Sequence, residues 1–149
     1  MVAGVVNDID LPTRVWLARL VARISLSCVW MYEGLVPKLL CVRSSEVDLV
    51  HRSGLYLADP RLTLNALGVA ELLFGVWLLT GRAERPTAAL AGAGIIILGT
   101  LVAIYQPESL ADPFGGISKN LGLLGCASVC WLLAPVVPAG EHSKGQRCE

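Results

Sequence analysis

Four long apolar blocks separated by polar stretches dominate the chain. The blocks cover residues 15–36, 62–79, 87–105 and 117–137. About 20 apolar residues in a helix cross the ~30 Å hydrocarbon core of a bilayer. The charged turn at residues 82–86 is short, so the blocks on either side of it must run in opposite directions. The pattern predicts an all-α integral membrane protein, an antiparallel four-transmembrane-helix bundle.

The polar stretch between the first two blocks contains one more predicted helix, over residues 44–55. Ser45 and Asp48 match a capping box at its start, and Gly54 suits its C-terminal stop. Two placements remain open for this helix. It is either an interfacial helix lying flat on the membrane between spans 1 and 2, or a loop helix without lipid contact.

The domain organisation follows from these boundaries. We expect an N-terminal segment over residues 1–13, one membrane domain over 14–138 and a polar C-terminal tail over 139–149. Pro37 is expected to end the first span. Only 16% of the residues are charged, against about 25% in soluble domains. The formal net charge is zero, so charge gives no argument for nucleic acid, and the lipid bilayer is the expected partner.

Charged residues within the apolar blocks need a physical explanation. Arg19, Arg23, Trp30 and Glu33 share one face of the first helix at 3.6 residues per turn. Glu71 lies near the middle of the second span, where insertion of a charge costs about 2.5–3.5 kcal/mol.

Two states of Glu71 lower that cost. Its carboxylate can pair with an arginine of the first span, Arg23 being the nearest candidate, or it can stay protonated because burial disfavours the charged form. We therefore predict a polar cluster of Arg19, Arg23 and Glu71 inside the bundle. Such a cluster serves either to fix the helix register or to form a ligand head-group site or proton relay. A Glu71→Gln variant separates these two roles.

Small and aromatic residues complete the pattern of candidate sites. Gly68 and Gly75 flank Glu71 and are expected to leave space for a large partner or a ligand. Trp30 either anchors the helix at the membrane interface or stacks on a ring-shaped ligand. The ligand-binding or proton-relay candidates are Arg19, Arg23, Trp30, Glu33, Glu71 and Lys119.

The third and fourth blocks carry features that predict packing. Ala88, Gly92 and Gly99 form a small-residue seam, which lets helices approach closely and permits a homo-oligomer. Lys119 shares a face of the fourth block with Cys126 and Cys130, and buried cysteines usually pack as small hydrophobic residues.

The sequence lacks the motifs of an autonomous enzyme. The five cysteines form no C-x-x-C pair, and neither histidine lies in an apolar block, so we expect no metal or haem site. Walker A, G-x-G-x-x-G, H-E-x-x-H and G-x-S-x-G patterns do not occur. The catalytic residues are therefore unknown.

Several short runs, in this order and spacing, resemble the DoxX-like family of small four-span membrane proteins. The matching residues are Arg23, the run 30–38 (WMYEGLVPK), the runs 46–50 and 53–55, Gly68 with Glu71 and Gly75, and the run 118–121 (SKNL). The similarity covers roughly residues 14–135. The cysteine-bearing tail departs from it.

The resemblance implies a redox context. The family takes its name from a membrane subunit of a thiosulfate:quinone oxidoreductase, and some relatives resemble the membrane part of proteins with an N-terminal NAD(P)-binding domain. We thus expect a non-autonomous subunit of a quinone- or thiol-linked membrane redox system, with quinone as the candidate cofactor. The alternatives are a small proton-linked carrier using Glu71, and a membrane anchor for a cytoplasmic oxidoreductase through the 82–86 turn or the tail.

The location follows from charge and from the resemblance. Basic residues tie at five on each side of the four spans, and Arg19 and Arg23 tip the bias toward cytoplasmic termini. The expected location is the bacterial inner (plasma) membrane with both termini in the cytoplasm.

Overall fold

The computed structural model describes residues 10–56, 59–110 and 116–134. Within these ranges every regular element is a helix and there is no strand, in line with the predicted all-α class. Most of the N-terminal segment, the last residues of the fourth apolar block and the polar tail lie outside the described residues. The elements are α2 (Leu11–Leu35), the π-helix η1 (Val36–Leu40), α3 (Ser44–Ser53), α4 (Pro60–Thr80), α5 (Glu84–Tyr105), the 3-10 helix η2 (Pro107–Leu110) and α6 (Gly116–Leu133).

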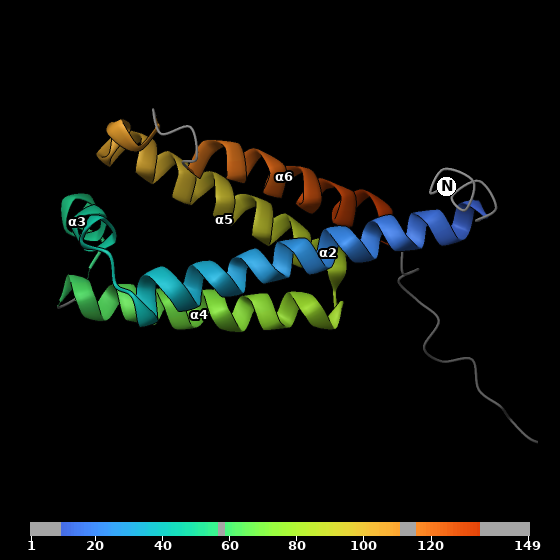
Figure 1. The fold of residues 1–149 in the computed structure, drawn as a ribbon, viewed down its shortest axis with the longest axis horizontal. Coiled ribbons are helices and arrows are strands. Elements are labelled where there is room, and N and C mark those ends of the chain that lie inside the picture. Colours follow the sequence, from blue (N-terminus) through green and yellow to red (C-terminus); the bar gives the residue numbers. More distant parts are fainter. Residues whose placement is uncertain (1–9, 57–58, 111–115, 135–149) are drawn as a thin grey trace, which may run out of the picture.

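The long helices pack as two pairs. Helix α4 lies along α2, and α5 lies along α6, while α2 also contacts α6 (Figure 1). Helices α4 and α5 barely touch, although only a tight turn at residues 81–83 joins them. Gly81 and Ala83 both have positive φ there, 67° and 49°, and glycine adopts such a conformation without strain. The two pairs are therefore joined closely at this turn and diverge toward α3.

Glycines set the close approach of α2 and α4. A Cβ atom on Gly34 would lie 2.5 Å from the carbonyl oxygen of Gly68, and one on Gly75 would lie 2.9 Å from the backbone nitrogen of Met31. Both distances are too short for real atoms, so only glycine fits. The expectation that Gly68 and Gly75 leave space for a ligand is wrong, because the backbone of α2 occupies that space.

Contrary to the expectation from the sequence, Pro37 does not end the first helix. The chain continues as the π-helix η1 to Leu40, with the Cys41 amide donating to the carbonyl oxygen of Val36 at 2.8 Å. Proline has no amide hydrogen and its ring crowds the carbonyl four residues earlier, which is that of Glu33. The wider π turn accommodates the proline and leaves the Glu33 carbonyl without its usual helical partner.

Helix α3 confirms the predicted short helix between the first two apolar blocks. Gly54 terminates it at φ 68°, as the sequence predicted. The predicted capping box is wrong by two residues, because Arg43 occupies the N-cap position and no side chain caps the helix. Residues of α3 contact both α4 and α5, so this helix links the two helix pairs where they diverge.

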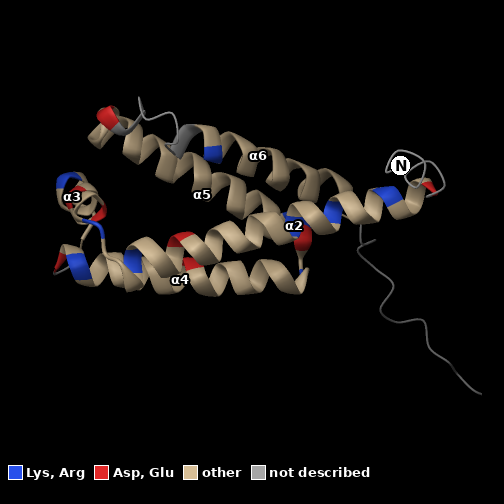
Figure 2. Ribbon diagram, viewed as in Figure 1, with Lys and Arg blue, Asp and Glu red and all other residues tan. Residues whose placement is uncertain are grey.

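The outer surface of the long helices is apolar. Leu11, Val21, Leu73, Ile97 and Leu132 are each at least 60% exposed. Most of the length of α5 and α6 carries no charged residue (Figure 2). A soluble monomer does not expose apolar area on this scale, whereas lipid covers it without penalty. Leu11–Leu40, Pro60–Thr80 and Glu84–Tyr105 are each long and apolar enough to cross a membrane. The protein is an integral membrane protein that contacts the lipid bilayer.

Helix α6 is the shortest of the long helices. Its 18 residues rise about 27 Å at 1.5 Å per residue, slightly less than the ~30 Å hydrocarbon core. The predicted fourth span continued to residue 137, and residues 135–137 lie outside the described part of the chain. A fourth crossing by α6 therefore stays a prediction.

Candidate functional site

A cavity of about 690 Å³ lies where the two helix pairs diverge. Its lining comes from α2, η1, α3, α4, α5 and α6, with apolar side chains such as Leu64, Ile95 and Leu123 forming much of the wall. Small-molecule sites typically have volumes of about 300–1,000 Å³ and are mostly apolar with a few polar groups. The cavity is therefore large enough for a ring-sized ligand.

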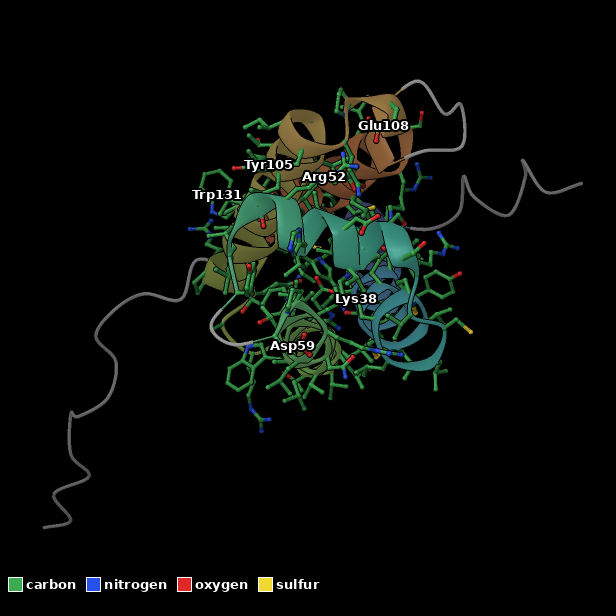
Figure 3. All side chains as sticks on the ribbon, turned by 90° about the vertical axis from the view of Figure 1, so that its left-hand side faces the viewer. Lys38, Arg52, Asp59, Tyr105, Glu108 and Trp131 are labelled. Atoms are coloured by element: carbon green, nitrogen blue, oxygen red, sulfur yellow. The ribbon has the colours of Figure 1, made fainter. Side chains whose placement is uncertain are left out.

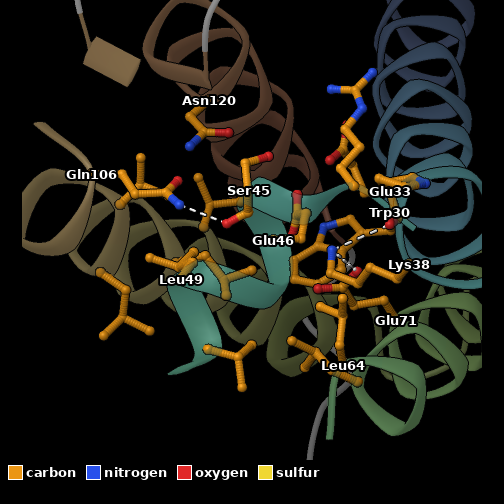
Figure 4. Close-up of a pocket in the computed structure, with 18 of the residues that line it drawn as sticks. Trp30, Glu33, Lys38, Ser45, Glu46, Leu49, Leu64, Glu71, Gln106 and Asn120 are labelled. Atoms are coloured by element: carbon orange, nitrogen blue, oxygen red, sulfur yellow. Dashed lines mark hydrogen bonds and ion pairs between the residues drawn. The ribbon is translucent and has the colours of Figure 1, made fainter. Parts of the chain in front are cut away.

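Glu71 meets a lysine rather than an arginine on the wall of this cavity. The Lys38 ammonium group donates to Oε2 of Glu71 at 2.7 Å, and their side chains are 7% and 4% exposed. Lys38 also donates to the Glu33 carbonyl oxygen at 3.2 Å (Figure 4). This is the carbonyl that Pro37 leaves without a helical partner, so the proline creates the second acceptor for Lys38. The other carboxylate oxygen of Glu71, Oε1, is buried without a hydrogen-bond partner among the described residues.

A second ion pair borders the same cavity. Lys119 of α6 donates to Oε1 of Glu33 at 2.7 Å, and these side chains are 41% and 29% exposed. Arg43 and Glu46 also line the cavity. Three basic and three acidic side chains thus face it, so it presents no excess charge to a ligand.

Trp30 supplies an unused hydrogen-bond donor to the cavity. Its ring packs edge-on against Phe74, with centroids 5.0 Å apart, and also contacts Gly94 of α5. The indole Nε1 is buried and has no acceptor among the described residues. A buried indole N–H ordinarily finds a partner. Trp30 therefore lies in the cavity wall rather than in an interfacial belt.

Helix α3 covers the cavity. In the end-on view it lies across the ends of the long helices, with Arg52 beside Tyr105 (Figure 3). Gln106 Nε2 donates to the Ser45 carbonyl oxygen at 2.6 Å (Figure 4). Arg52 donates to the Tyr105 carbonyl oxygen at 3.4 Å. No residue of α3 is buried, although Ser45, Glu46, Leu49, Val50 and Ser53 all line the cavity. Two hydrogen bonds to the end of α5 thus help to hold a lightly packed helix in place.

Arg19 and Arg23 lie at the other end of the bundle, away from Glu71. Arg19 Nε donates to Glu84 Oε2 at 2.6 Å, and Arg23 lies 3.8 Å from Glu84 Oε1. The guanidinium of Arg23 packs against Gly81. Glu71 lies ten residues before Gly81 on the same helix, which is about 15 Å of rise and beyond the reach of an arginine side chain. The predicted cluster of Arg19, Arg23 and Glu71 is therefore wrong.

Four of the six candidate residues do come together. Trp30, Glu33, Glu71 and Lys119 all line the cavity, whereas Arg19 and Arg23 do not. Sequence reasoning missed Lys38 and Glu84, the partners that complete the two sites. A comparison of the depths of charged residues in the membrane would have indicated Glu84. Arg19 and Arg23 lie near the start of the first span, at the level of the 82–86 turn that contains Glu84.

The small residues of α5 and the cysteines of α6 pack between helices. A Cβ on Gly92 would only reach ordinary contact with Leu124 and Ala127, at 3.9 and 4.0 Å. Cys130 is buried with Ala22 and Ala88 in a small apolar cluster. Among the described residues, no three or more His, Cys, Asp or Glu side chains gather as a metal ion would require.

Comparison with known proteins gives one match. Neither a curated protein nor a solved structure matches the chain. The sequence model of the DoxX-like family matches residues 27–140, which is most of the chain and includes α3, the cavity and both partners of the Lys38–Glu71 pair. The chain belongs to the DoxX-like family.

Proposed function

We propose that the protein binds a neutral, ring-headed amphiphile, of which a quinone is the best example, in the cavity beneath α3. The observation that carries this proposal is the pair of unused polar atoms in an otherwise apolar wall. Trp30 Nε1 can donate a hydrogen bond and Glu71 Oε1 can accept one, and neither has a partner among the described residues. A buried polar group without a partner costs about 1–3 kcal/mol, which a suitable ligand would recover.

The charge of the cavity selects the class of ligand. Its three basic and three acidic side chains are balanced, so an ionic ligand gains no net attraction there. A quinone carbonyl accepts hydrogen bonds from groups such as Trp30 Nε1, and a quinol hydroxyl donates to groups such as Glu71 Oε1. The apolar remainder of the wall suits the ring and the start of an isoprenoid tail.

The proposed role is that of a membrane subunit in a redox system. The chain supplies the binding site, and a separate oxidoreductase partner would supply the electrons. The chemistry that a bound quinone brings is the uptake of two electrons and two protons. In this chain Glu71 and Lys38 are the groups placed to hold a proton beside such a ligand.

The proposed topology places the cavity near one membrane face. Four antiparallel spans form one domain over residues 14–138, with α3 interfacial and both termini cytoplasmic in a bacterial inner membrane. Over the whole sequence, the side of the 81–83 turn and the two termini carries seven basic residues against five on the other side, which supports a cytoplasmic position under the positive-inside rule. The cavity then opens toward the opposite face.

The test is binding of decylubiquinone to protein purified in a mild detergent. Bound quinone is quantified by mass spectrometry of an organic extract after size exclusion. Wild type should retain quinone. Trp30→Phe removes the hydrogen-bond donor, and Glu71→Gln replaces a charged acceptor with a weaker neutral one, so each should weaken binding about tenfold.

Two matched variants make the test specific. Trp77→Phe changes an exposed tryptophan on α4, and Glu84→Gln changes an ion-paired glutamate away from the cavity, so both should bind like wild type. Equal loss in all four variants, or unchanged binding in Trp30→Phe and Glu71→Gln, would contradict the proposal. In the latter case, flux of a proton-coupled solute into proteoliposomes becomes the measurement to make on Glu71.

A further inference from the structure

The end of the bundle opposite the cavity carries an excess of arginine. A single carboxylate, Glu84, serves both Arg19 and Arg23. Arg82 and Arg85 flank that glutamate in the turn, and neither forms an ion pair among the described residues. Arg19, Arg23, Arg82 and Arg85, called the arginine cluster below, thus share this end of the bundle with Glu84, and the end retains positive charge.

Buried donor atoms of this cluster lack acceptors. The Nε atoms of Arg23 and Arg85 are both buried and have no hydrogen-bond partner in the part of the chain that the structure describes, and Oε1 of Glu84, an acceptor at this end of the bundle, is in the same state. The first turn of α5 adds the backbone N–H groups of Glu84 and Arg85, since Ala83 at the N-cap offers no side-chain acceptor. Guanidinium groups and a helix N-terminus together favour a phosphate oxygen.

Tryptophans mark the depth of the arginine cluster in the membrane. Trp16, Trp77 and Trp131 are 56%, 52% and 51% exposed and lie on α2, α4 and α6 toward this end. Exposed tryptophans of membrane proteins concentrate at the level of the lipid head groups. The arginine cluster is therefore at the height at which lipid phosphates occur.

We infer that the arginine cluster binds the phosphodiester head group of an anionic phospholipid. The phosphate would accept from Arg82 and Arg85, and the acyl chains would lie against the exposed apolar faces of α4 and α5. The inference does not depend on a ligand in the cavity. Free phosphate carries the same charge but lacks the acyl chains, so the lipid should bind far better than the free anion.

Native mass spectrometry of the detergent-purified protein tests this inference. Phosphatidylglycerol should remain bound in a defined stoichiometry, whereas phosphatidylcholine should not. Arg85→Gln should weaken phosphatidylglycerol binding about tenfold, because it removes a charge-assisted hydrogen bond. Arg61→Gln, an exposed arginine at the opposite end of α4, is the matched control and should leave binding unchanged.

Three results would overturn the inference. One is equal retention of phosphatidylglycerol by Arg85→Gln and wild type. A second is equal loss in Arg61→Gln, which would indicate unspecific charge attraction. The third is full competition by inorganic phosphate at matched ionic strength, which would identify a site for the free anion instead of a lipid.

Discussion

Helix α2 and the π-helix η1 that continues it make ion pairs at both ends of the bundle, and these pairs differ in depth, packing and accessibility. At the cavity, Lys38 and Glu71 are one cation and one carboxylate, 7% and 4% exposed, beside unused polar atoms. At the arginine cluster, two cations share Glu84, and the arginines are 23% and 21% exposed. The first pair faces an internal space, and the second lies next to the closely packed Ala22, Ala88 and Cys130.

The difference shows that the neighbours of an intramembrane charge, and not its position in the sequence, determine how strongly it depends on an ion-pair partner. Arginines near a helix end can extend toward the head groups, so their ion pair needs little further support. The Lys38 and Glu71 side chains are buried away from the head groups, so each depends on the other to compensate its charge. The cavity end is therefore the more sensitive of the two, and four changes should reveal this, in decreasing order of effect.

The largest effect is expected from Gly68→Val, which separates α2 from α4 at the Lys38–Glu71 pair. A Cβ there would lie 2.8 Å from both the Gly34 carbonyl oxygen and the Lys38 Cβ, so backbone atoms must move. Overpacking of this kind costs about 1–3 kcal/mol. Separating the helices also breaks the buried Lys38–Glu71 pair, which adds about 3–5 kcal/mol. We expect a strongly lowered melting temperature in detergent or no folded protein at all.

Gly125→Val on α6 is the control for that experiment. Nothing lies within 4 Å of a Cβ at this position, so the melting temperature should change little. Equal destabilisation by the two substitutions would show that the loss comes from valine in a helix and not from the close approach of α2 and α4.

The α2–α4 contact also shows how far the sequence could predict the molecule. The apolar blocks predicted the all-α class and the positions of the described helices, because lipid demands long apolar segments. Gly68 and Gly75 were recognised as special, but their role was not, since a glycine leaves space equally for a ligand or for a second backbone. Only the register of α2 against α4 decides between these, and no local pattern encodes that register.

The same limit applies to the candidate site. Glu71 was identified from its depth alone, and its partner was not, because Lys38 follows a proline that was expected to end the helix. The π turn at Val36–Leu40 keeps Lys38 within the fold and frees the Glu33 carbonyl for it. The cavity itself arises from the divergence of α4 and α5, which is a property of the whole assembly and of no single segment.

The second-largest loss of stability is expected when the Lys38–Glu71 pair itself is broken. Glu71→Gln should lower the free energy of unfolding by about 3–5 kcal/mol, because it leaves the Lys38 ammonium group buried without a counterion. The double variant Lys38→Met with Glu71→Leu should recover most of that loss, since no buried charge remains. Melting temperatures of Lys38→Met, Glu71→Leu and the double variant, compared as a double-mutant cycle, measure this, with Glu71→Gln beside them. A double variant no more stable than Glu71→Gln would contradict the assignment.

A smaller effect is expected from Glu84→Gln in the arginine cluster. Glutamine can still accept a hydrogen bond from Arg19, and both arginines can turn toward the head groups, so the loss should be about 1–2 kcal/mol. The measurement is the melting temperature beside that of Glu71→Gln, an identical chemical change. If Glu84→Gln lowers the melting temperature as much as Glu71→Gln, both ion pairs depend equally on their carboxylates, and the cavity end is not the more sensitive one.

The smallest effect should come from Lys119→Met, which isolates burial as the variable. Lys119 and Lys38 border the same cavity, and each forms a 2.7 Å ion pair with a glutamate. Their side chains differ in exposure, 41% against 7%, so water screens the first pair and not the second. An exposed ion pair contributes about 0–1 kcal/mol, so Lys119→Met should lower the melting temperature far less than Lys38→Met. Because salt screens exposed charges, raising its concentration should shrink the difference between wild type and Lys119→Met. A loss equal to that of Lys38→Met would show that the Glu33–Lys119 pair is as shielded from water as the deeper one, and that α3 covers the cavity more tightly than its exposed residues indicate.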